Sequence, residues 1–98
     1  MLKPARRGAI PSVEEAEAIA ASALAFIAED QARLMQFMQS TGVDPGTLSQ
    51  RAGSREILEA ALAYLVEDES ALLVFAAGAG IQPERISPAL AVLQRSAL

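Results

Sequence analysis

An internal repeat constrains this chain more than any other feature of its sequence. Residues 23–49 align without gaps onto residues 61–87, at a constant offset of 38 residues, and ten of the 27 aligned positions are identical. The identities include a Glu-Asp pair, a Phe, a Gly and a Pro: Glu29/Glu67, Asp30/Asp68, Phe37/Phe75, Gly42/Gly80 and Pro45/Pro83. Two copies are too few for a solenoid, which needs about three. The repeat therefore predicts an all-α, compact bundle of about six helices, built from two duplicated three-helix units at about 12–52 and 54–96.

Polar residues before apolar stretches predict where the helices begin. Ser12 with Glu15 forms the Ser-x-x-Glu pattern of a capping box, which opens a helix running to about Ala28. The other expected N-caps are Asp30, Asp44, Ser54 and Asp68. Gly42, and either Gly78 or Gly80, are expected to end the second and fifth helices in a left-handed conformation.

Pro88 sets the expected start of the last helix. A proline inside a helix that began at Pro83 would cost about 3 kcal/mol. We therefore expect a turn at 83–87, followed by a helix with Ser87 as its N-cap and Pro88 at its first position.

The fifth expected helix contains four consecutive apolar residues, from Leu72 to Phe75. Each residue turns a helix by about 100°, so these side chains point around most of its circumference. Either this helix is the central one of the bundle, or part of it contacts another chain. We expect it to be the most buried element, with Leu72 and Phe75 in the core and Leu73 or Val74 at a second contact. A homodimer is one such arrangement.

Composition excludes several kinds of chemistry. The chain has 98 residues, one domain's worth, and neither Cys nor His. Disulfides, thiolate zinc sites, Ser-His triads and Cys nucleophiles are excluded with them. The acidic pairs Glu29-Asp30 and Glu67-Asp68 could hold a hard cation, but helix capping explains them more simply. We expect no enzyme, no cofactor and no metal.

Charge is unevenly distributed along the chain. The first twelve residues carry Lys3, Arg6 and Arg7 and no acid, so the net charge of −4 leaves −7 on the remainder. We expect residues 1–11 to form a flexible basic arm and residues 12–98 to form a single helical domain. No apolar segment resembles a signal peptide, and the longest apolar run, 71–81, is about half the roughly 20 residues that span a bilayer. We expect a cytoplasmic protein that does not contact a membrane.

Residues 34–52 imitate a helix-turn-helix. Apolar residues and a turn glycine stand where that motif needs them, and the candidate nucleic-acid contacts are Arg6, Arg7, Arg51 and Arg55. Gly46 weakens the would-be reading helix, and the acidic body repels phosphates. A structural turn is therefore favoured over a DNA reader.

The string 23–30 (ALAFIAED), with Leu34, Phe37 and the TGVDP of 41–45 after it, resembles a family of short bacterial proteins known only as a domain of unknown function. The likeness extends over about residues 16–93. The resemblance implies a small all-α cytoplasmic bacterial protein, and it assigns no catalytic or binding residue. The leading hypothesis is a non-enzymatic protein–protein interaction module with Leu73 and Val74 on its contact surface and an unknown partner. The alternative is a nucleic-acid-associated regulator that uses the turn at 34–52 and the basic arm.

Overall fold

The computed structural model describes residues 10–96 and is all-α over that range, with no strand among the described residues. Six α-helices and one short 3-10 helix follow one another along the chain. They are α1 (Val13–Ala28), α2 (Gln31–Thr41), α3 (Pro45–Arg51), α4 (Arg55–Glu67), α5 (Glu69–Ala79), η1 (Pro83–Arg85) and α6 (Ile86–Ser96). The expected fold class and helix number are confirmed.

The capping residues lie where the sequence places them. Ser12 and Glu15 form a complete capping box: Ser12 Oγ accepts from the Glu15 backbone N–H, and Glu15 Oε1 accepts from that of Ser12. The four other expected N-caps each accept a backbone N–H three residues later: Asp30, Asp44, Ser54 and Asp68. Gly42 and Gly80 follow α2 and α5 with φ of +75° and +70°. These local patterns therefore predict where α1 to α5 begin and where α2 ends, and of the two glycines expected at the end of α5 it is Gly80 that ends it.

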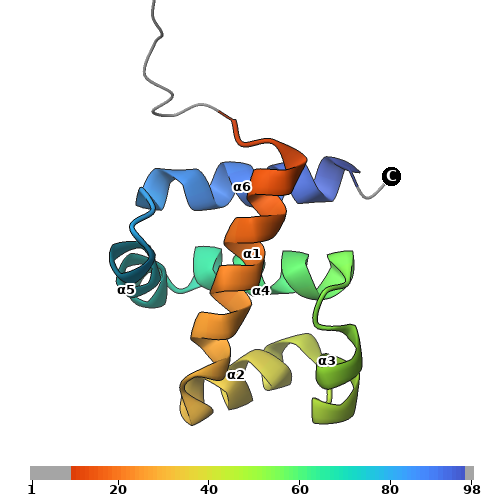
Figure 1. The fold of residues 1–98 in the computed structure, drawn as a ribbon. Coiled ribbons are helices and arrows are strands. Elements are labelled where there is room, and N and C mark those ends of the chain that lie inside the picture. The colour runs from red at the N-terminus through yellow and green to blue at the C-terminus, as the bar shows by residue number, and fades with distance from the viewer. Residues whose placement is uncertain (1–9, 97–98) are drawn as a thin grey trace, which may run out of the picture.

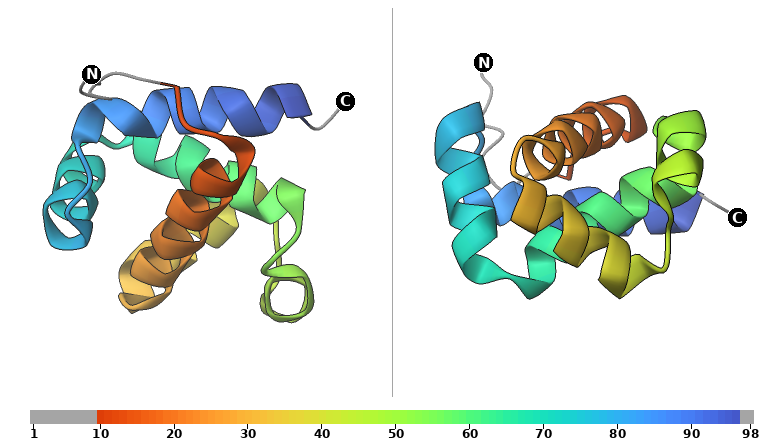
Figure 2. Two further views of the ribbon diagram at one scale, coloured as in Figure 1. Left: turned by 45° about the horizontal axis from the view of Figure 1, so that its top comes forward. Right: turned by 90° about the horizontal axis from the view of Figure 1, so that it is seen from below.

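Three helices surround the core. Helix α1 crosses in front of α4 and α6, which lie side by side behind it (Figure 1). Buried alanines let these helices approach closely, because a methyl group fills little space between two backbones: Ala16, Ala20, Ala23, Ala61 and Ala89. Helices α5 and α3 stand on opposite sides of α1, as the view from below shows (Figure 2).

The start of the last helix differs from the prediction. Helix α6 begins at Ile86 rather than with Ser87 as its N-cap, because η1 runs directly into it. Ile86 has helical dihedral angles, φ −68° and ψ −49°. Pro88 then lies in the first turn of α6, where backbone N–H groups have no partner within the helix and proline is tolerated.

The prediction that α5 is the most buried element is wrong. Only Phe75 and Ala76 are buried on α5, whereas α1 and α4 bury five residues each. Phe75 lies in the core as expected, but Leu72 is only half-buried. Helix α5 is peripheral. Its consecutive apolar residues point in several directions, but only one side of the helix packs against the rest of the chain. Of the two alternatives for α5, the central helix is excluded.

Contacts between the two repeat units follow the offset of 38. The rings of Phe26 and Phe75 lie 5.5 Å apart, and those of Phe37 and Tyr64 lie 5.9 Å apart. Because Tyr64 aligns with Phe26 and Phe75 with Phe37, these two pairs are equivalent. A pseudo-twofold axis between the units predicts such equivalent pairs, because it interchanges the units and so makes each contact between them occur twice. Superposition of residues 23–49 on 61–87 remains a prediction.

Candidate interaction surface

The outer side of α5 carries an exposed apolar cluster. The side chains of Leu73 and Val74 are 47% and 59% exposed, and Ala77, one turn after them, is exposed as well. We call these three residues the α5 patch. No charged side chain occurs between residues 71 and 82. Single exposed apolar residues are ordinary, but an uncharged helix face with two large aliphatic side chains is typical of a contact surface.

A small groove joins the α5 patch to α1. Its volume is about 350 Å³, and its walls are Ser22, Phe26, Glu29, Val74, Phe75, Gly78 and Ala79. The Arg33 guanidinium carbon lies 3.9 Å from the centre of the Phe26 ring, and one Arg33 Nη1–H donates to the Phe26 carbonyl at 2.7 Å. Phe26 in turn contacts Phe75. The wall of this groove is therefore held by stacked side chains and is preorganised.

A second groove lies on the other side of α1, where α1 faces the junction of α3 and α4. It has a volume of about 700 Å³, and we call it the α1–α3 groove. Its walls are Glu17, Ala18, Ala21, Leu24, Ala25, Ala28, Ala52, Gly53 and Leu58. Glu17 is the one charged residue of this set, and its Oε2 accepts from Arg55 Nη2 at 2.9 Å. The groove is thus apolar, and its one acid already has a partner.

The sequence named Leu73 and Val74 but not the rest of this surface. The missed residues lie mainly on α1, where the exposed alanines recur at the heptad spacing 3-4-3: Ala18, Ala21, Ala25 and Ala28. This spacing is visible in the sequence and is typical of a helix face that contacts another helix. Phe26 and Ala77 are the other residues of this surface that were not predicted from the sequence.

The third cleft, of about 550 Å³, is acidic and lies between α2 and the α4–α5 junction. Tyr64 Oη–H donates to Gln36 Oε1 at 2.9 Å. Burial, and next the charge of Asp68, raise the pKa of Tyr64, so the phenol is neutral near pH 7. Asp68 Oδ1 caps α5 by accepting from the Ala71 N–H. The acidic pair here is therefore a helix cap, and within residues 10–96 no group of three or more potential metal ligands gathers.

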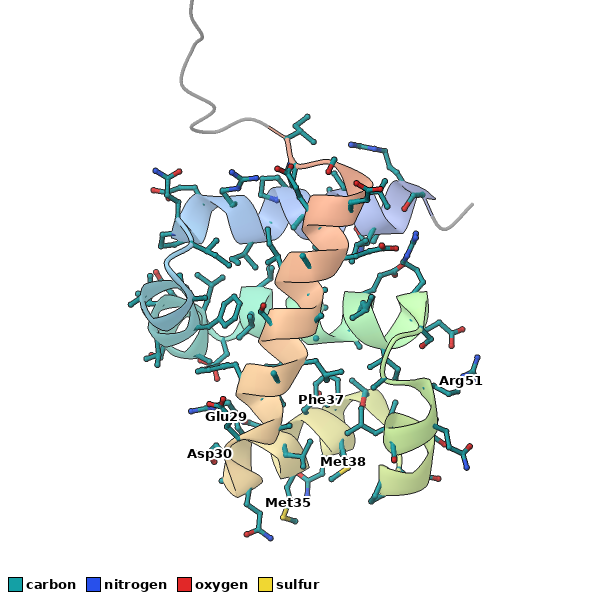
Figure 3. All side chains as sticks on the ribbon, viewed as in Figure 1. Glu29, Asp30, Met35, Phe37, Met38 and Arg51 are labelled. Atoms are coloured by element: carbon teal, nitrogen blue, oxygen red, sulfur yellow. The ribbon has the colours of Figure 1, made fainter. Side chains whose placement is uncertain are left out.

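The basic residues considered as nucleic-acid contacts do not form one surface. Arg51 projects from α3 into solvent, with Nη2 3.9 Å from Glu56 Oε1 (Figure 3). Arg55 is bound to its own chain, since its guanidinium donates to Glu17, to the Leu93 carbonyl and to Ser96 Oγ. Arg6 and Arg7, and most of the expected arm, lie outside the described residues.

Comparison with known proteins identifies the family. A family model described as a protein of unknown function, DUF3572, matches residues 13–96, from the first residue of α1 to the last of α6. The chain belongs to the DUF3572 family. No curated protein and no solved structure matches it. Among the described residues, no helix of this DUF3572 protein has the length and apolarity needed to cross a membrane.

Proposed function

We propose that this DUF3572 protein is a non-enzymatic protein–protein interaction module, and that its contact surface is the α5 patch with the adjoining groove on α1. The observation that carries the proposal is the exposure of Leu73 and Val74 on a helix that has no charged side chain from residue 71 to 82. An apolar helix face of a partner is the ligand that such a surface favours, because it covers these side chains without leaving a charge unpaired.

Energetics support this choice. A fully buried Leu or Val side chain contributes about 1.5–3 kcal/mol relative to an exposed one. Covering two half-exposed side chains therefore stabilises a complex appreciably. Stacking of Arg33 on Phe26 holds the wall beside Val74, so little order has to be gained when a partner binds.

Electrostatics favour a protein partner over nucleic acid. The described residues carry only Arg33, Arg51, Arg55, Arg85 and Arg95 as basic side chains, and twelve acidic ones. Three of these arginines contact acids of the same chain within 3.8 Å: Arg33, Arg55 and Arg85. A phosphate backbone needs clustered Lys and Arg that are available to it. The cytoplasmic location expected from the sequence remains a prediction.

The test is affinity capture from native cells with Val74→Asp and a matched control. Val74 on α5 and Met35 on α2 are both at least half exposed, so Val74→Asp and Met35→Asp make comparable changes on different helices. Met35 is labelled in Figure 3. We expect both variants to fold, by circular dichroism, and only Val74→Asp to lose the proteins captured by the wild type. Nuclease treatment should leave the captured set unchanged. Capture that survives Val74→Asp, or disappears with nuclease, overturns the proposal.

A further inference from the structure

We propose that residues 31–53, which contain α2 and α3, open as one unit while the rest of the chain stays folded. We call these residues the α2–α3 segment. It occupies the end of the molecule opposite α6, with α4 between them (Figure 1). The segment contains no residue of the α5 patch, so this inference does not depend on the proposed function.

One side chain anchors the α2–α3 segment in the core. Phe37 is fully buried, and every other residue from 31 to 53 is at least partly exposed. By contrast, α1 and α4 bury five residues each, and α6 buries four. Packing of an apolar face supplies most of the stability of a helix in a protein. Helices α2 and α3 have the fewest buried residues of the six α-helices, and so they have the least packing to hold them in place.

Few hydrogen bonds join the α2–α3 segment to the rest of the described chain. Outside the helices, backbone hydrogen bonds connect it only at its two ends, to Asp30 and to Ser54. Beyond those ends the polar links are made by side chains: Tyr64 to Gln36, Arg33 to Phe26 and Arg51 to Glu56. The Arg51–Glu56 pair is largely exposed, and such pairs contribute little because water screens them.

The second repeat unit is closed more firmly than the first. Residues 45–51 of α3 align with residues 83–89, which form η1 and the start of α6. Ile86 is fully buried, whereas the aligned Leu48 is only half-buried. Helix α6 then buries three more residues, whereas α3 ends after seven residues with none buried. We therefore expect this opening in the first unit.

Both ends of the α2–α3 segment are suited to act as hinges. Asp30 has an extended conformation between two helices, with φ −122° and ψ 119°. At the other end, residues 52–54 separate α3 from α4, and a β-carbon added at Gly53 would have no atom within 4 Å. Rotation at these two places moves α2 and α3 without breaking either helix.

Phe37 makes the main contact that closes the segment. Its ring meets the Tyr64 ring of α4 edge to face, with 5.9 Å between the ring centres and 83° between the planes. Leu34, Met38 and Leu48 pack against the core only in part. Opening therefore exposes one fully buried side chain, and the large apolar contacts among α1, α4 and α6 remain. Such a small loss permits a minor open population under native conditions.

Native-state hydrogen exchange, followed residue by residue by NMR, tests this opening. After correction for the rates of an unfolded chain, we expect amides of α2 and α3 to exchange at least about 30-fold faster than those of Leu62 and Leu65 in α4. Low concentrations of urea should accelerate exchange in α4 but not in α2 or α3, because a local opening exposes little surface. If the three helices instead share one exchange free energy and one urea dependence, the segment opens only with the whole protein and the proposal is wrong.

A core variant outside the segment separates local from global opening. Val92→Ala removes buried methyl groups from α6, which stays packed whether the segment is closed or open. It should accelerate exchange in α4 and α6 about tenfold and leave α2 and α3 unchanged. Equal acceleration in α2 and α4 would overturn the proposal, because the segment would then open only by global unfolding.

Variants within the segment test the role of Phe37. Phe37→Leu weakens a contact that only the closed form makes, so it should accelerate exchange in α2 and α3 about tenfold. Exchange in α4 should rise by a similar factor, since global unfolding loses the same contact. Met35→Ala shortens an exposed side chain of the same helix and should leave all rates within about threefold. Unchanged exchange of α2 in Phe37→Leu, or an equal acceleration by Met35→Ala, would show that Phe37 does not hold the segment closed.

Discussion

Helices α2 and α5 occupy equivalent places in the repeat, and they bury the same positions but expose different chemistry. Phe37 and Phe75 are both buried, and Leu34 and Leu72 are both half-buried. The exposed positions differ: Gln36, Gln39 and Ser40 on α2 align with Val74, Ala77 and Gly78 on α5. The inward Phe and Leu thus recur in both helices, whereas these three outward positions do not; Met35 and Leu73 are aligned as well, and both are apolar and exposed.

This difference distinguishes the residues that core packing requires from those that it does not. Packing against the core dictates an inward-facing residue, because interiors are close-packed and tolerate little change in volume. An outward-facing position has no such constraint from the fold, and α2 shows that polar side chains are acceptable there. Val74, whose counterpart on α2 is Gln36, therefore needs another reason to be apolar, and contact with another protein is the one that we propose.

The largest expected effect comes from the two equivalent phenylalanines. Phe37→Ala and Phe75→Ala should each lower the free energy of unfolding by about 3–5 kcal/mol, because each removes a buried ring from an aromatic pair. Urea unfolding followed by circular dichroism measures both. If one variant loses less than about 1 kcal/mol, its ring contributes little and the two positions are not energetically equivalent.

Local patterns predicted much of this fold, and long-range packing accounts for the rest. A side-chain cap acts within three residues, so Ser12, Asp30 and Asp68 could be assigned from the sequence alone. The run from Leu72 to Phe75 indicates an apolar helix but not which helices surround it, and the expected central position was wrong. The surface was predicted only in part: Leu73 and Val74 were named, whereas the grooves beside α1 depend on how α3 and α5 flank that helix.

The paired glycines give the next effect. Gly42→Ala and Gly80→Ala should each cost about 1 kcal/mol, because both residues have positive φ, which strains a side chain with a β-carbon. No atom lies near either added β-carbon, so the cost comes from the backbone alone and should be similar at the two sites. Thermal unfolding of each variant measures this loss of stability. Gly53→Ala is the matched control, since its β-carbon also has open space and its φ is not positive. A loss at Gly53 as large as at the other two would contradict this explanation.

Exposed positions should change stability least while changing association most. Val74 is the most exposed large side chain of α5, and Val74→Gln gives α5 the residue type that α2 has at the aligned position. For the monomeric chain, the free energy of unfolding should change by no more than about 0.5 kcal/mol. Gln39→Ala gives α2 the residue that α5 has at the aligned position, Ala77, and should be equally mild. A Val74→Gln protein that unfolds readily would show that Val74 supports the core, and the contrast between α2 and α5 would then have a structural cause.

The smallest expected effect is a pH dependence at the first of the two equivalent caps. The backbone N–H of Arg33 donates to Asp30 Oδ1 at 3.0 Å and holds the pKa of that carboxyl below its ordinary value of 3.8. The native state therefore favours the ionised carboxylate. The stability from this group is fully present above pH 3.8 and is lost as the pH falls through the lowered native pKa. Asp30→Asn keeps a capping oxygen that does not titrate, so its stability should fall less steeply than the wild type's in acid, with little change at pH 7. Thermal unfolding between pH 2 and 7 compares the two proteins. If the two curves of melting temperature against pH are parallel, the Asp30 carboxyl has the same pKa in the folded and the unfolded chain. The hydrogen bond from the Arg33 N–H would then not depend on the charge of Asp30.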